Sequence, residues 1–127
     1  MRTLFAAAML ACIAALAGCT AKLDHTKEFT VPPFGETHWI LDAQSKPQKI
    51  KIEVQSDQDL DVFVLSPDMA DKFQDLKPGE AEKAAIAHKK GVKAETVTAD
   101  IPAKTAYSVL VGNPKKTATG KVHITNQ

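Results

Sequence analysis

Gln-Lys-Ile-Lys-Ile-Glu-Val-Gln-Ser-Asp-Gln-Asp-Leu-Asp-Val-Phe-Val-Leu, residues 48–65, is the stretch that decides the fold. In its first part, Ile50, Ile52 and Val54 alternate with charged residues. Alternation with a period of two predicts a strand that has one buried face and one solvated face. Such half-buried strands are typical of antiparallel sheets.

The second part of this stretch predicts a turn followed by a central strand. Ser56 to Asp59 is polar and has the composition of a turn. Leu60 to Leu65 is apolar on both faces except at Asp61, which indicates that both faces are covered. Five further segments have strand character, and turn residues separate them: 28–31, 37–42, 93–101, 105–112 and 117–125.

A helical insertion is expected between the fourth and fifth strands. Ser66, Pro67 and Asp68 form a favourable helix start, with an N-cap, a first-turn proline and an acid near the positive end of the helix. We expect this helix to extend to Leu76. Residues 80–90 fit either a helix that ends at Gly91 or a short edge strand, and the sequence leaves both readings open.

About seven short strands and one short helical insertion predict a mainly β protein, an antiparallel β-sandwich spanning residues 27–127. Trp39, the sole tryptophan, is expected to contribute to its core. After residues 1–18, the 15 acidic residues face an equal number of Lys and Arg, because Arg2 is the one basic residue lost. Such a balance argues against a nucleic-acid-binding protein.

Residues 1–18 have the features of a secretory signal peptide. A basic start is followed by an uncharged apolar run from Leu4 to Ala17, which is shorter than the about 20 residues that span a membrane. The run ends at Leu16-Ala17-Gly18-Cys19.

Leu16-Ala17-Gly18-Cys19 resembles the lipobox of bacterial lipoproteins. The resemblance implies that signal peptidase recognises Leu16, Ala17 and Gly18, cleaves before Cys19, and leaves Cys19 carrying acyl chains such as palmitate. Two or three chains hold a protein on a bilayer far more firmly than one. Cys12 leaves with the signal peptide, so no cysteine pair remains for a disulfide.

Residues 19–26 are predicted to be a short lipidated tether. The polar segment from Thr20 to Thr26 reaches about 25 Å when fully extended, which would hold the domain close to the membrane. Thr20 occupies the position where lipoproteins retained in the inner membrane often have Asp. The resemblance therefore implies an outer-membrane lipoprotein facing the periplasm.

The mature domain is similar to the small secreted β-sandwiches of the pre-peptidase C-terminal and GOLD-type domains. Three features carry this resemblance: Trp39 early in the chain, the strand from Leu60 to Leu65, and the segment Ala106 to Asn113 before the closing strand. The resemblance implies a non-catalytic accessory domain that binds ligands or other proteins.

Few residues suggest a metal site. Asp57 and Asp59 are weak calcium candidates, but Val62 occupies the position where an EF-hand loop needs glycine. The histidines at 25, 38, 88 and 123 lack the spacing of metal ligands. Pairing of strands far apart in the chain is the one route by which His38 and His123 could meet. No metal or other cofactor is therefore expected.

An enzyme is not expected either. Ser45, Ser56, Ser66 and Ser108 lack the Gly-x-Ser-x-Gly context of a nucleophile elbow, and no glycine-rich phosphate loop occurs. We therefore expect a lipid-anchored envelope protein that binds a protein or glycan partner, with the insertion at residues 66–91 as the expected surface. The alternative is a structural envelope protein that acts through self-association.

Overall fold

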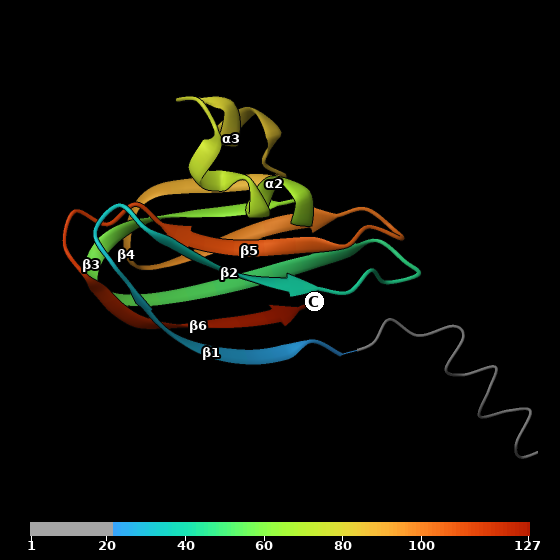
Figure 1. The fold of residues 1–127 in the computed structure, drawn as a ribbon. Coiled ribbons are helices and arrows are strands. Elements are labelled where there is room, and N and C mark those ends of the chain that lie inside the picture. Colours follow the sequence, from blue (N-terminus) through green and yellow to red (C-terminus); the bar gives the residue numbers. More distant parts are fainter. Residues whose placement is uncertain (1–21) are drawn as a thin grey trace, which may run out of the picture.

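β3 (Gln48–Leu65) is the strand to which the rest of the sheet attaches. The computed structural model describes residues 22–127, and its chain is mainly β (Figure 1). Within these residues, no helix has the length and apolar character needed to cross a membrane. The other strands are β1 (Asp24–Val31), β2 (Glu36–Leu41), β4 (Ala87–Ile101), β5 (Tyr107–Gly112) and β6 (Ala118–Asn126).

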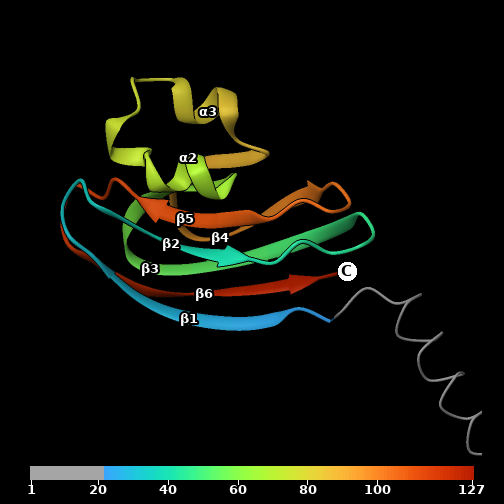
Figure 2. The ribbon, with the colours of Figure 1, turned by 45° about the vertical axis from the view of Figure 1, so that its right-hand side comes forward.

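The six strands form one antiparallel sheet that folds over into two layers (Figures 1 and 2). The strand order is β1-β6-β3-β5-β2, and β4 pairs with the other edge of β3. The first half of β3, from Ile50 to Ser56, pairs with β6, and the second half, from Asp61 to Leu65, pairs with β5. β4 pairs with both halves. The antiparallel β-sandwich expected from the sequence is thus confirmed.

The turn predicted at Ser56–Asp59 is wrong, because β3 continues through it as a bent strand. Ser56 pairs with Gly120 of β6, and the register between β3 and β4 shifts between Gln55 and Leu60 and again between Leu60 and Val62. Bulges of this kind bend a strand and increase its twist. Two predicted strands are therefore the two halves of one, and the sheet has six strands.

The core between the layers follows the alternation of β3. Ile50, Ile52 and Val54 are buried, as the period of two predicts, and Leu60, Val62 and Val64 continue this buried face. Tyr107 is also buried in this core, whereas Trp39 is half-buried and packs at its margin, with its ring centroid 6.3 Å from that of Phe29.

The insertion explains why the second half of β3 is apolar on both faces. Phe63 and Leu65 point away from the main core and form a second cluster with Leu110 and with Phe73 and Ala81 of the insertion. The insertion contains α2 (Pro67–Asp71), a 3-10 turn (Phe73–Asp75) and α3 (Glu80–Ala84). It lies over the outer face of the β5 layer (Figure 2).

The insertion is more irregular than predicted. The Ser66 hydroxyl accepts a hydrogen bond from the Met69 N–H, as the N-cap prediction requires, but α2 ends at Asp71 and not at Leu76. Residues 80–90 combine both alternatives, since α3 ends at Ala84 and β4 begins at Ala87. Gly91 does not stop a helix and lies within β4 with a φ of 67°.

We expect the Tyr107 phenol to lose its proton at a higher pH than a solvent-exposed tyrosine does. Its hydroxyl is buried and has no hydrogen-bond partner among residues 22–127, and burial raises its pKa from 10.0 to about 12. An unfolded tyrosine loses its proton near pH 10, so the contribution of Tyr107 to folding stability should be fully present below about pH 10 and be lost between there and about pH 12.

Tyr107 is the sole tyrosine, so phenolate absorbance near 295 nm reports it directly. The midpoint should lie near 12 in the folded protein and near 10 in denaturant. A folded-state midpoint near 10 would contradict the buried placement.

Candidate functional site

The two ends of the sandwich differ in what they carry. At the end that we call proximal, β1 begins and β6 finishes, with Asp24 opposite Thr125. At the distal end, Val31 lies opposite Ala118, and the bend of β3 lies beside the loops at residues 32–35 and 113–117 (Figure 1). The larger surface depressions border the bend at this distal end.

Two aspartates close the distal bend by accepting hydrogen bonds. The carboxylate of Asp57 accepts a bond of 2.8 Å from the Thr119 N–H. Asp61 accepts bonds from the Gly91 N–H at 3.2 Å and from the Asn113 side-chain amide at 3.4 Å. These contacts join β3 to β4, to the end of β5 and to β6, so Asp57 and Asp61 have structural roles.

The weak calcium candidates do not form a pair. Asp57 borders a depression on the sheet face, whereas Asp59 borders a different one at the tip. Within residues 22–127, no three His, Cys, Asp or Glu side chains gather in a way that would hold a metal ion.

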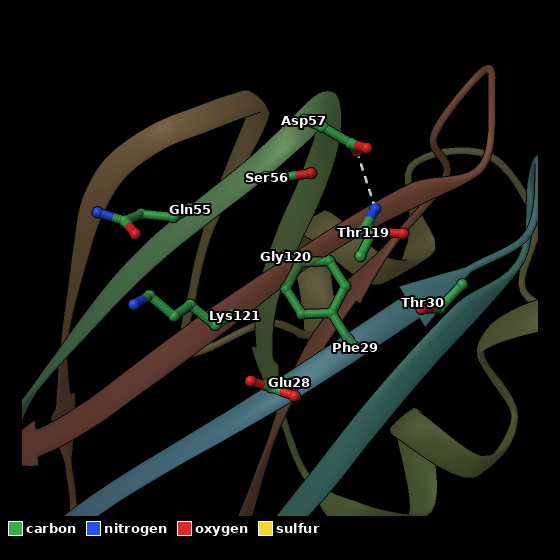
Figure 3. A pocket seen from close by; sticks show the side chains of 9 residues that line it. All are labelled: Glu28, Phe29, Thr30, Gln55, Ser56, Asp57, Thr119, Gly120 and Lys121. Carbon is green, nitrogen blue, oxygen red and sulfur yellow. Dashed lines mark hydrogen bonds between the residues drawn. The ribbon is translucent and has the colours of Figure 1, made fainter.

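The larger depression, which we call the sheet depression, lies across β1, β6 and β3 and has a volume of about 690 Å³. Figure 3 shows its polar side chains on the three strands, with the Asp57–Thr119 contact at one side. Gly120 lies between Phe29 and Ser56 in the register of these strands. The lining residues are Glu28, Phe29, Thr30, Gln55, Ser56, Asp57, Thr119, Gly120 and Lys121.

The second depression, the tip depression, has a volume of about 480 Å³ and lies on the other side of the bend. Its residues come from β3, β4 and the loop between β5 and β6: Gln58, Asp59, Leu60, Asp61, Gly91, Lys93, Asn113, Lys115 and Lys116. Sequence reasoning missed this grouping because the contributing segments are far apart in the chain. The available signals were two groups of lysines in the sequence, Lys89-Lys90-x-x-Lys93 and Lys115-Lys116.

Two backbone hydrogen bonds join the distal loops. The Phe34 N–H donates to the Pro114 carbonyl at 2.8 Å, and the Asn113 N–H donates to the Gly35 carbonyl at 2.9 Å. Phe34 and Asn113 both have a φ of 57°, in the left-handed region that a bulky residue seldom adopts. The Phe34 side chain is nevertheless 67% exposed. Backbone strain of this kind tends to occur at functional sites.

The histidines are engaged separately. His38 lies between two carboxylates, with Nδ1 3.1 Å from Glu36 and Nε2 3.3 Å from Asp71. His123 has its Nε2 2.6 Å from Asp24, and this contact lowers the pKa of the Asp24 carboxyl. His38 and His123 therefore have different partners.

The insertion presents no broad apolar surface. Its Ala70, Phe73 and Ala81 are buried against the sheet. The large apolar side chains exposed within residues 22–127 are dispersed at Phe34, Ile40 and Ile86. The insertion thus acts as a cover for the sheet, and the distal end is the stronger candidate surface.

The lipobox residues Leu16, Ala17, Gly18 and Cys19 lie outside the described residues. The folded domain begins earlier in the chain than the expected boundary at residue 27. Leu23 is buried, and its N–H donates to the Asn126 side chain at 2.9 Å. β1 begins at Asp24, so residues 24–26, which were assigned to the tether, belong to the sheet.

Comparison with protein-family models and with curated proteins yields no match. Solved structures do resemble this fold. One is PliG of Aeromonas hydrophila, a periplasmic inhibitor of g-type lysozyme, with a TM-score of 0.54, 16% identity, and coverage of 85% of this chain and 88% of PliG. Another is the Yersinia pseudotuberculosis-derived mitogen, with a TM-score of 0.50, 11% identity, and coverage of 83% and 86%. At these identities the likeness establishes a shared β-rich fold.

We expect Gly120→Ala to destabilise the protein severely. A Cβ at this position would lie 2.0 Å from the Gln55 carbonyl oxygen and 2.8 Å from the Ser56 Cα. Backbone atoms cannot move aside as a flexible side chain does, so we expect a loss of about 3 kcal/mol or more in the free energy of unfolding. Urea denaturation measures this loss.

Gly79→Ala is the matched control. Its Cβ would meet no atom within 4 Å, and its φ of 86° limits the expected cost to that of a left-handed alanine, about 1–2 kcal/mol. A Gly120→Ala protein as stable as the Gly79→Ala protein would show that β3 and β6 do not approach in this register.

Proposed function

We propose that this protein is a lipid-anchored, non-catalytic binding protein of the bacterial cell envelope that engages its partner with its distal end. The single observation that carries the proposal is the opposition of the two ends. The chain enters the sheet at the proximal end, and the strained Phe34 loop and both depressions lie at or beside the distal bend.

The short entry segment supports close anchoring. Leu23 is fixed to β6 through Asn126, so four residue steps separate it from Cys19. That length reaches about 14 Å when extended, less than the full tether expected from the sequence. A lipid on Cys19 would then hold the proximal end against the bilayer. β1 has 8 residues, which at about 3.3 Å each place the distal end about 26 Å farther out.

The serines support a non-catalytic role. Ser66 caps α2, the Ser56 hydroxyl accepts a hydrogen bond from the Gln58 N–H, and Ser108 is fully buried. The first two hydroxyls are engaged in local hydrogen bonds, and the hydroxyl of Ser108 is buried without a hydrogen-bond partner among residues 22–127. The fold shared with a periplasmic lysozyme inhibitor is in keeping with a binding role in the envelope.

Cys19→Ala tests the anchor. Wild-type protein expressed in bacteria should incorporate labelled palmitate and sediment with membranes, and the Cys19→Ala protein should do neither. Cys12→Ala is the matched control, because the other cysteine of the chain lies in the segment predicted to be removed. Equal palmitate labelling of wild type and Cys19→Ala would rule out lipidation at this residue.

Site-specific crosslinking in intact envelopes tests the distal surface. A photoreactive amino acid in place of Lys116 should yield adducts with a glycan or another protein, and the same group in place of the insertion's Gln74 should not. Mass spectrometry identifies the adducts. If only the Gln74 position forms adducts, the insertion and not the distal end is the binding surface. If the only adduct is with a second copy of this chain, the result favours self-association.

A further inference from the structure

The tip depression carries positive charge that the fold leaves unmatched. Three of its five charged residues are the lysines at 93, 115 and 116, and within residues 22–127 none of these ammonium groups forms an ion pair with a carboxylate. Lysines beside them on β4 are paired: Lys89 lies 2.7 Å from Glu95, and Lys90 lies 2.5 Å from Glu82. What distinguishes the three unpaired lysines of the depression from other unpaired lysines is that they border one concave surface.

The acids of the depression do not neutralise it. Asp61 already accepts hydrogen bonds from the Gly91 N–H and the Asn113 amide, which fix its carboxylate on the wall. Asp59 remains as the one carboxylate there without such a bond among the described residues. Three lysines against two aspartates leave this concave surface with a net positive charge of one, and such a surface attracts an anion.

An aromatic side chain lies on the adjoining loop. The loop of Phe34 is hydrogen-bonded to the loop of Lys115 and Lys116 through Pro114 and Asn113. Phe34 is 67% exposed and is held in a left-handed conformation, so its ring gains little stability from burial while its backbone conformation costs stability. An exposed ring beside cations suits a ligand that has both an apolar face and negative charge.

We propose that the tip depression and Phe34 bind a carboxylate-bearing anionic glycan of the cell wall. This rests on the proposed function, which turns the distal end away from the membrane. A sugar ring offers an apolar face to Phe34, and carboxylates on the glycan or its peptide substituents pair with the lysines. The membrane that holds the lipid anchor lies at the opposite end, about 26 Å away along β1, and so does not reach this site.

Co-sedimentation with purified cell-wall sacculi tests the inference, using the full chain purified from membranes in a neutral detergent. The variant Lys93→Gln/Lys115→Gln/Lys116→Gln should bind at least 10-fold more weakly than wild type, and wild-type binding should weaken as salt rises. The control Lys72→Gln/Lys77→Gln/Lys83→Gln removes equal charge from exposed lysines of the insertion and should change binding less than 2-fold. Equal losses in the two variants would overturn the site.

Two further arms identify the ligand chemistry. Sacculi whose carboxylates have been converted to amides should lose binding, and vesicles rich in anionic lipid should not compete with untreated sacculi. Binding to the vesicles but not to sacculi, or undiminished binding to amidated sacculi, would overturn the proposal.

Phe34→Gly separates binding from folding. It relieves the left-handed strain, so the thermal midpoint should stay equal or rise while affinity for sacculi falls. Unchanged affinity would remove Phe34 from the site. If wild-type protein that carries palmitate fails to bind sacculi, the glycan inference fails while the anchor stands. If wild-type protein binds sacculi but carries no palmitate, the proposed anchoring fails and the binding result stands.

Discussion

The pairing of β4 with both halves of β3, on either side of the bend, is the constraint on which the structure depends. β6 pairs with the first half of β3, and β5 pairs with the second half. The two layers therefore remain one sheet across the bend. The register shifts between Gln55 and Val62 allow the bend, because extra residues in a bulge turn a strand without ending its ladder. Gly120 allows β6 to approach the bend closely, since a side chain there would collide with the Gln55 backbone.

The helical insertion buries the outer apolar face of the second half of β3, which the core between the layers leaves uncovered. The second half of β3 has apolar residues on both faces, and a single inter-layer core buries one of them. The insertion covers Phe63, Leu65 and Leu110 with Phe73 and two alanines. Burial of each large side chain contributes about 1.5–3 kcal/mol, which favours a cover that stays in place. The insertion therefore uses its apolar side chains within the fold and has few left for a partner.

The two ends of the domain are suited to different tasks. At the proximal end, Leu23 is buried and hydrogen-bonded to Asn126, so little free chain precedes the sheet. At the distal end, Phe34 and Asn113 adopt left-handed conformations in two loops that hold each other through backbone hydrogen bonds. An exposed aromatic ring in a strained loop adds nothing to folding stability, and unpaired lysines border the depression next to it. Lys104, in the loop that joins β4 to β5 at the proximal end, also has a left-handed φ of 60°, so strain alone does not distinguish the ends. The exposed ring and the two depressions are the physical basis for proposing attachment at one end and recognition at the other.

The sequence by itself determined the fold class, because a period-two pattern such as Ile50-Ile52-Val54 can bury its apolar side chains in a sheet but not along one face of a helix. It also determined the helix start at Ser66, since capping is a local hydrogen bond. The tertiary structure alone decided that Ser56–Asp59 is a bent strand and not a turn, because the pairing of Ser56 with Gly120 and the hydrogen bond from Thr119 to Asp57 are contacts that local composition does not record. It alone brought Asp61, Gly91 and Asn113 together and gathered the lysines of the tip depression, since these residues lie far apart in the chain and meet only when the sheet folds over.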